Sequence, residues 1–152
     1  MSAAMPSTFL SKSVYAAEHP DSLAIYCSDG RFTRAVEELV GQLGHARLDT
    51  LTLPGGPGLL APSTAYSERE TVSRAASFLI VGHHIRHVVL IAHAGCGYYR
   101  DRYAGESAEA TEARQLADLA SARRALEQSH PSLRIRTQYL RVADTQARFE
   151  EH

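Results

Sequence analysis

The sequence lacks several features that would indicate particular classes of protein. No apolar run approaches the roughly 20 residues that a membrane-spanning helix needs. The formal net charge is −1 over 152 residues, which gives no electrostatic case for binding to nucleic acid or to a membrane surface. Lys12 is the only lysine, and the arginines that supply the other positive charges do not cluster. The sequence also contains no internal repeats, low-complexity tracts or linkers.

Cysteine is scarce as well, with Cys27 and Cys96 the only two. These residues could form one disulfide. No apolar secretory segment precedes them, however, since residues 1–12 are mostly small and polar and include Pro6. We therefore expect a soluble, cytoplasmic protein.

The length and the hydrophobic pattern indicate one ordinary domain. A chain of this size can bury roughly 70% of the surface that its unfolded form exposes, which is enough for a proper core. We expect a single domain over 1–152, in which 1–19 form an N-terminal arm. Apolar runs predict strands, and apolar residues spaced three and four positions apart predict helices. The predicted elements, in order, are a strand at 23–26, a helix at 33–43, a strand at 48–53, a helix at 67–82, a strand at 88–92, a helix at 107–129 and a strand at 133–140.

This alternation of strands and helices is typical of an α/β fold with a mostly parallel central sheet. We expect three layers, with helices on both faces of the sheet. Ligands of such sheets bind beyond the carboxyl ends of the strands, where successive connections leave to opposite sides. The first and third strands should flank that point, so the residues that end these two strands are candidates for chemistry.

Several local predictions accompany this outline. Ser67 followed by Glu70 has the form of a capping box and places the start of the second helix at Ser67. Glycine and proline predict an irregular loop over 54–62, and a polar, tyrosine-bearing loop is expected over 98–105. A short N-terminal helix is predicted from apolar residues spaced for one face, Phe9, Leu10, Val14 and Tyr15. The inward face of the last helix is predicted to carry Ala113, Leu116, Leu119, Ala120 and Leu126.

Potential metal ligands follow two of the predicted strands. The apolar run at 88–92 leads directly to His93 and then to Cys96, and Cys27 ends the first apolar run. If these strands are parallel neighbours, the three side chains meet at one edge of the sheet. Two thiolates and one imidazole suit zinc, and three protein ligands leave the fourth tetrahedral position open, as in catalytic zinc sites. Zinc in that state lowers the pKa of its bound water to about 7.

Asp29 and Arg31 follow the first cysteine closely. Asp29, two residues past Cys27, can accept a hydrogen bond from a zinc-bound hydroxide, and Arg31 can hold Asp29 through a charge-assisted fork. The alternative interpretation of this pair is a turn residue and a solvated charge.

The spacing of these residues resembles the paired signature of the β-class carbonic anhydrases. The matching pattern is Cys27-x-Asp29-x-Arg31, followed far downstream by His93-x-x-Cys96. The resemblance implies that the two cysteines and the histidine hold one zinc ion per chain, and that Asp29 and Arg31 form the catalytic dyad of that family. It also implies a homodimer or higher homo-oligomer. The sheet would have the strand order 2-1-3-4, with an additional strand near the C-terminus.

The activity that the resemblance implies is the zinc-dependent, reversible hydration of carbon dioxide to bicarbonate through zinc-bound hydroxide. Two alternatives stay open: hydrolysis of carbonyl sulfide or carbon disulfide on the same fold, and a zinc-holding scaffold without turnover. The scaffold is considered because Leu53-Pro54-Gly55-Gly56 stands where relatives usually carry Arg-Asn-Ala-Gly. His83, His84 and His87 are also closely spaced, and we interpret them as a surface cluster rather than a second metal site.

Overall fold

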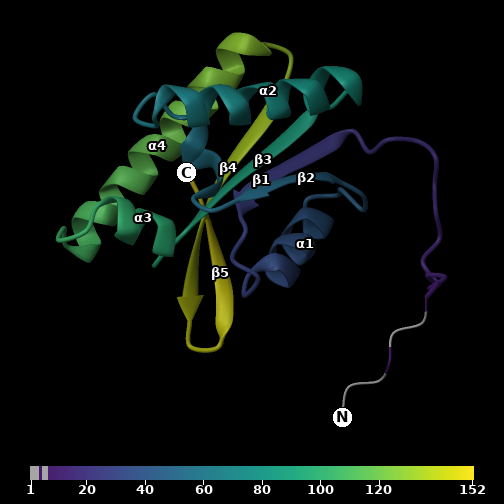
Figure 1. Cartoon of the computed structure of the whole chain (residues 1–152), viewed down its shortest axis with the longest axis horizontal. Helices are drawn as coiled ribbons and strands as arrows, with labels where there is room; N and C mark the ends of the chain where they lie inside the picture. The colour runs from purple at the N-terminus through teal and green to yellow at the C-terminus, as the bar shows by residue number, and fades with distance from the viewer. Residues whose placement is uncertain (1–3, 5–6) are drawn as a thin grey trace.

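The computed structural model describes Ala4 and residues 7–152, and within these residues the chain forms a five-stranded sheet with helices on both faces (Figure 1). The strands are β1 (Ser22–Cys27), β2 (Asp49–Leu53), β3 (His87–His93), β4 (Arg134–Ala143) and β5 (Gln146–Glu151). The helices are α1 (Thr33–Gln42), α2 (Tyr66–Gly82), α3 (Gly97–Arg102) and α4 (Ala108–Ser129), with a 3-10 helix, η1 (Gly56–Leu60), between β2 and α2. In the described part of the chain, no helix has the length and apolar character needed to cross a membrane.

The strands lie in the order β2-β1-β3-β4-β5. β1 pairs in parallel with both β2 and β3, β3 pairs in parallel with β4, and β5 returns antiparallel along β4. The predicted α/β class and the expected order 2-1-3-4 are therefore confirmed. β5 is the additional strand that the family resemblance implied. Its residues are mostly exposed, so the hydrophobic pattern gave no signal for it.

The alternation of side chains along β1 explains the three layers. Leu23 and Ile25 point to the face covered by α2, α4 and η1, whereas Ala24 and Tyr26 point to the face covered by α1. β3 pairs with β1 in register and continues both faces. Each fully buried Leu or Ile side chain stabilises the fold by about 1.5–3 kcal/mol. The predicted helices on both faces of the sheet are confirmed (Figure 1).

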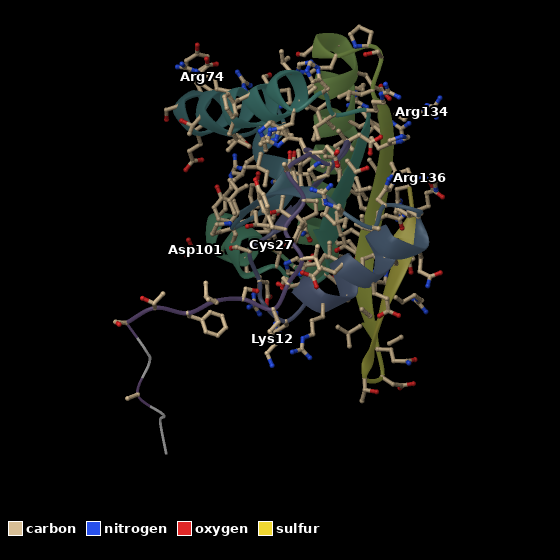
Figure 2. All side chains as sticks on the ribbon, turned by 90° about the vertical axis from the view of Figure 1, so that its right-hand side faces the viewer. Lys12, Cys27, Arg74, Asp101, Arg134 and Arg136 are labelled. Atoms are coloured by element: carbon tan, nitrogen blue, oxygen red, sulfur yellow. The ribbon has the colours of Figure 1, made fainter. Side chains whose placement is uncertain are left out.

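The N-terminal arm differs from the prediction. Residues 7–19 form no helix, and this segment leaves the body of the molecule (Figures 1 and 2). Near the end of the arm, Arg47 Nη2 donates to the carbonyl oxygen of Glu18, and the His19 ring stacks on His83 with 3.8 Å between centroids. A helix this short is marginal in water without a surface to pack on. The side chains expected to share its face are exposed instead: Phe9 by 74%, Leu10 by 87%, Val14 by 96% and Tyr15 by 87%.

The starts of the two long helices can be compared with the predicted starts. α4 begins at Ala108, one residue after the predicted start, because Ser107 is its N-cap and the Ser107 hydroxyl accepts from the backbone N–H of Ala110 at 3.1 Å. α2 begins earlier than predicted, at Tyr66 with Ala65 as its N-cap. Ser67 already lies inside the first turn of α2, and the helix has no side-chain cap, so the capping-box prediction is wrong.

The glycine-rich segment after β2 is not the irregular loop that was expected, since it forms the buried helix η1. The glycines of η1 let its backbone lie close to β1 and to Tyr99. A Cβ on Gly56 would lie 2.8 Å from the backbone nitrogen of Cys27, and a Cβ on Gly58 would overlap the hydroxyl of Tyr99. The loop expected over 98–105 is likewise helical at its start, as α3. α3 is too short to show a repeated apolar spacing, which explains why the sequence pattern missed it.

Replacing Gly56 with alanine should destabilise the fold by about 2–5 kcal/mol. The φ of Gly56 is +56°, and its Cβ would press on the backbone of β1. A left-handed φ costs an L-residue about 1–2 kcal/mol, and overpacking adds about 1–3 kcal/mol. Gly105→Ala is the matched control, because Gly105 has φ +88° but nothing within 4 Å of its Cβ position. Urea unfolding followed by circular dichroism measures the free energy of unfolding of both variants. An equal loss in the two variants would show that the close approach of Gly56 to β1 does not matter for stability.

Candidate metal centre

The carboxyl ends of β1 and β3 bring three potential metal ligands together. Cys27 is the last residue of β1, His93 is the last residue of β3, and Cys96 ends the short ligand loop, residues 93–96, that leads into α3. Their ligand atoms all lie within 4.8 Å of one another. His93 and Cys96 are buried, and Cys27 is partly buried. The predicted meeting of these side chains at one edge of the sheet is confirmed.

The orientation of His93 leaves one ring nitrogen available to a ligand. Nδ1 lies 2.9 Å from the carbonyl oxygen of Ala94, and because a carbonyl can only accept, the proton of the neutral ring resides on Nδ1. Nε2 then presents its lone pair. This nitrogen is buried and has no hydrogen-bond partner among the described residues. A buried polar group without a partner costs about 1–3 kcal/mol, so the arrangement indicates a group that binds Nε2.

The two cysteine sulfurs share one environment, and both are free thiols. Cys96, together with His93 and backbone groups of Gly55 and Asp29, outweighs the effect of burial and lowers the pKa of Cys27 to about 4. The neighbouring Cys27 raises the pKa of Cys96. Burial lowers the pKa of His93, but Cys27 and a backbone carbonyl outweigh burial and raise it overall. A cation among the three side chains would favour a second thiolate, because it supplies the positive charge that the pair of sulfurs lacks.

Asp29 and Arg31 form an ion pair beside the three ligands. The Arg31 Nη2 atom lies 2.6 Å from Asp29 Oδ2, and Arg31 Nε lies 3.0 Å from Asp29 Oδ1. Hydrogen bonding by Arg31 lowers the pKa of Asp29 to about 2. The Asp29 side chain is 21% exposed, whereas that of Arg31 is 71% exposed. The carboxylate is therefore ionised and turned toward Arg31, and it does not belong to the group of ligand atoms within 4.8 Å of one another.

The inward face of α4 differs from the prediction in a way that concerns the site. Leu119 and Leu126 are buried as expected, and Leu116 is partly buried, but Ala113 and Ala120 are exposed. Polar residues take their place. These polar residues follow a helical i, i+4, i+7 spacing, and this spacing could have indicated that they share a buried face. Their polarity argued against burial, so the sequence pattern did not place them there. The buried polar residues are Thr111, Gln115 and Asp118.

Two of these polar side chains hold segments at the ligand loop. Gln115 Nε2 donates to the carbonyl oxygen of His93 at 2.9 Å, and Gln115 Oε1 accepts from the hydroxyl of Tyr139 at 3.2 Å. Asp118 accepts from the hydroxyl of Tyr99 on α3 at 2.7 Å. Burial raises the pKa of Tyr99, so its hydroxyl keeps the proton that it donates. Sequence reasoning did not identify these partners.

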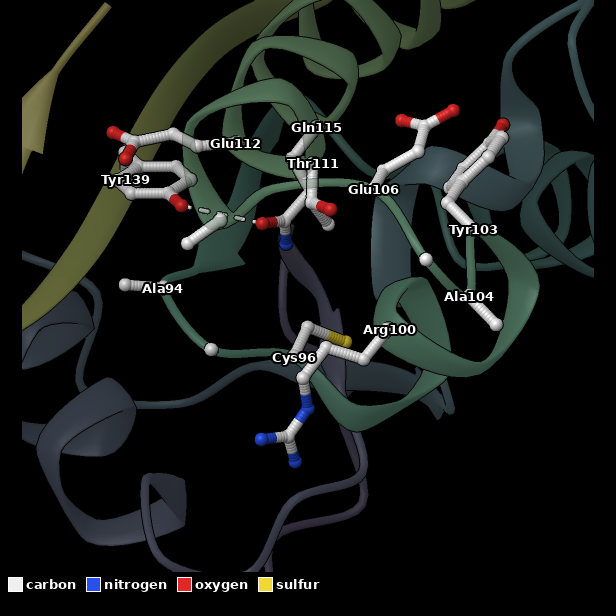
Figure 3. A pocket seen from close by; sticks show the side chains of 13 residues that line it. Ala94, Cys96, Arg100, Tyr103, Ala104, Glu106, Thr111, Glu112, Gln115 and Tyr139 are labelled. Carbon is white, nitrogen blue, oxygen red and sulfur yellow. Dashed lines mark hydrogen bonds between the residues drawn. The ribbon is translucent and has the colours of Figure 1, made fainter.

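A cavity of about 480 Å³ lies against the Cys96 side of the ligand loop (Figure 3). Cys96 forms part of its wall, and Thr111 and Gln115 of α4 line it together with Tyr139 of β4. Figure 3 shows the hydrogen bond between Tyr139 and Gln115 at the border of this space. The polar face of α4 therefore contacts the ligand loop and also borders open volume.

The histidines near the end of α2 make other contacts. His83 Nδ1 lies 2.5 Å from Asp49 Oδ2, and the His87 ring lies 4.8 Å from the ring of His45. Among the described residues, the three side chains at the ends of β1 and β3 are the only group of three or more placed to hold a metal ion. His83 and His87 are partly buried and have different partners, and His84 is exposed.

The side chains at the sheet edge fit a zinc ion. Sulfur and imidazole nitrogen are preferred zinc ligands, and three protein ligands leave one tetrahedral position for another group. The partnerless Nε2 of His93 and the paired sulfurs are what such an ion would satisfy. Cys27, His93 and Cys96 could therefore hold a zinc ion.

No protein-family model and no curated protein matches the chain. Solved structures do match it. The β-carbonic anhydrase CafA of Aspergillus fumigatus is 18% identical, with a TM-score of 0.55 over 88% of this chain and 76% of that one. A tetrameric β-carbonic anhydrase of Sordaria macrospora is 13% identical, with a TM-score of 0.58 over 88% and 81%. The β-carbonic anhydrase isoform I of Trichomonas vaginalis is 11% identical, with a TM-score of 0.58 over 92% and 87%. The chain therefore has the fold of the β-carbonic anhydrases.

Proposed function

We propose that this chain is a zinc-dependent enzyme that interconverts carbon dioxide and bicarbonate. The observation that carries the proposal is the group formed by Cys27, His93 and Cys96, with the ion pair of Asp29 and Arg31 beside it. The similarity of the fold to β-carbonic anhydrases supports the same activity. The reaction joins the oxygen of water to the carbon of carbon dioxide and releases one proton, which passes to buffer.

In this proposal the two cysteines and His93 hold one zinc ion, which when bound makes hydroxide available near neutral pH. Asp29 is the acceptor that orients the reacting water through a hydrogen bond. Arg31 keeps the Asp29 carboxylate in position through hydrogen bonds from its guanidinium group. Because Arg31 engages this carboxylate, Asp29 does not occupy the fourth ligand position. The ion pair therefore keeps the site open to substrate.

Removing any one ligand should remove most of the bound zinc. Cys27→Ala, His93→Ala and Cys96→Ala each leave two ligands, too few for a stable zinc site in a protein. His130→Ala is a control, because His130 contacts Ser77 away from the three ligands. Elemental analysis of protein purified without chelators should find about one zinc per chain in the wild type and in the control. A wild-type protein without near-stoichiometric zinc would contradict the proposed site.

Arg31→Gln should lower the rate of carbon dioxide hydration by about 100-fold while zinc content stays unchanged, because misplacing an orienting group costs rates of this order. Arg34→Gln is the matched control, since Arg34 is an exposed arginine on α1. Stopped-flow hydration assays measure both variants. Full activity of Arg31→Gln would exclude a catalytic role for the ion pair. If wild-type protein holds zinc and releases sulfide from carbonyl sulfide but does not hydrate carbon dioxide, the substrate is carbonyl sulfide and not carbon dioxide.

We also propose that two copies of the chain associate through the N-terminal arm. Its large apolar side chains are the most exposed ones among the described residues, and Phe78 and Val81, near the end of α2, are also exposed, by 69% and 65%. A second copy that covered the arm would remove this apolar surface from water. The similar enzyme of Sordaria macrospora is tetrameric.

Replacing Val14 and Tyr15 together with serine should raise the dissociation constant of the dimer at least about tenfold, because burying one such side chain is worth about 1.5–3 kcal/mol. Val142→Ser is the control, since Val142 is 61% exposed but lies on β4. Light scattering over a micromolar dilution series measures the mass of all three proteins. A wild-type protein that is monomeric throughout the series would contradict the proposed assembly.

A further inference from the structure

We infer that Gln115 is a positioning residue for the candidate metal centre, because its carboxamide fixes the backbone of His93 and thereby the direction of the ligating imidazole. The inference rests on the zinc site of the proposed function. Gln115 belongs to α4, so it acts on the site from a different part of the chain than the ligands themselves. Its side-chain hydrogen bonds go to the His93 carbonyl oxygen and to Tyr139, and not to the three ligand atoms.

The hydrogen bond from Gln115 reaches the end of β3, where the strand is still paired with β4, opposite Leu140, but no longer with β1. The pairing of β3 with β1 ends at Ile91, so the carbonyl of His93 lies beyond that ladder. Gln115 Nε2 donates to this carbonyl oxygen at 2.9 Å. Gln115 is 3% exposed, so water does not compete for the contact. The last residue of β3 is therefore held by a side chain at a position where the β1 ladder no longer holds it.

Tyr139 fixes which end of the carboxamide faces His93. The Tyr139 hydroxyl lies 3.2 Å from Gln115 Oε1, and burial raises the pKa of Tyr139 to about 12, so the hydroxyl keeps its proton and donates it. The nitrogen end of the carboxamide is then directed at the His93 carbonyl, which can only accept. The three groups form a chain of donors in one direction, from Tyr139 through Gln115 to His93.

His93 is therefore held at its carbonyl oxygen and at its ring, in addition to its pairing with Leu140 of β4. Its carbonyl oxygen accepts from Gln115, and its Nδ1 donates to the carbonyl of Ala94. Among the described residues no hydrogen-bond partner reaches Nε2, which lies on the side of the two cysteines. Partners that orient a metal ligand from outside typically contribute about 10–100-fold to metal affinity. Because Gln115 acts through the backbone rather than on the ring, an effect at the lower end of this range is expected.

The cavity beside the ligand loop makes the inference testable by substitution. Gln115 and Tyr139 border this space, so Gln115→Met removes both hydrogen bonds without opening a sealed void (Figure 3). Thr111→Val is the matched control. Thr111 lines the same cavity and is 8% exposed, but its hydroxyl bonds to the carbonyl of Ser107 at the start of its own helix.

The experiment measures zinc affinity by chelator competition in the full chain. Gln115→Met should raise the zinc dissociation constant about tenfold, and Tyr139→Phe should raise it about two- to threefold because Gln115 keeps its bond to His93. Thr111→Val should change it less than about twofold. The visible absorption bands of the cobalt-substituted protein, which report ligand geometry, should shift in Gln115→Met and not in Thr111→Val. Thermal unfolding of the metal-free proteins checks that both variants fold cooperatively, and Gln115→Met should unfold at the lower temperature because the His93 carbonyl and the Tyr139 hydroxyl lose their partner.

Gln115→Met with wild-type zinc affinity and unshifted cobalt bands would overturn the inference while the zinc site stood. An equal loss of affinity in Thr111→Val would also overturn it, because general packing would then explain the effect. Wild-type protein that binds no zinc would overturn the proposed site and this inference together. Wild-type protein that binds zinc but does not hydrate carbon dioxide would overturn only the proposed activity, since the affinities still report the positioning of His93.

Discussion

The register between β1 and β3 is the constraint on which the candidate site depends. Tyr26 pairs with Ile91, so Cys27 ends its strand close to where His93 ends the neighbouring one. Both strands are parallel, and their carboxyl ends therefore reach the same edge of the sheet. A shift by one residue would turn every side chain of one strand to the opposite face. The apolar residues that fix this register, such as Ile25 and Leu90, are fully buried, so the core of the protein sets the position of the ligands.

The buried face of α4 both packs on the sheet with apolar residues and carries polar residues that bond to segments near the ligand loop, and these two uses conflict. Its carboxyl half is apolar and packs on the sheet, whereas its amino half carries Gln115 and Asp118 in the interior. Buried polar groups are tolerated only when their hydrogen bonds are made. Gln115 bonds to the end of β3, and Asp118 bonds to α3 and, through Ser63, to the segment after η1. The amino half of α4 therefore buries less apolar surface, but its hydrogen bonds orient the segments that flank Cys96, which apolar packing alone does not do.

Sequence patterns predicted the parts of the molecule in which neighbouring residues carry the signal. The four parallel strands, the long helices and the meeting of the three potential ligands beyond the ends of β1 and β3 all belong to this class, because spacing and strand ends are local properties. α3 has six residues and was missed. The helix expected in the N-terminal arm did not form, because helical spacing does not stabilise a short segment whose apolar side chains are exposed. Gln115 was missed because its partners, His93 and Tyr139, lie 22 and 24 residues away in the chain, and only the fold brings them together.

The confinement of lysine to Lys12 has a consequence for handling the protein. Lys12 is exposed on the N-terminal arm (Figure 2), and every other basic residue apart from histidine is an arginine. A protease that cleaves only after lysine therefore has one peptide bond to cut, and that bond lies ahead of β1 and of all the helices. Such a cut releases Phe9 and Leu10 together with the start of the chain and leaves the sheet, the ligand loop and α4 covalently intact.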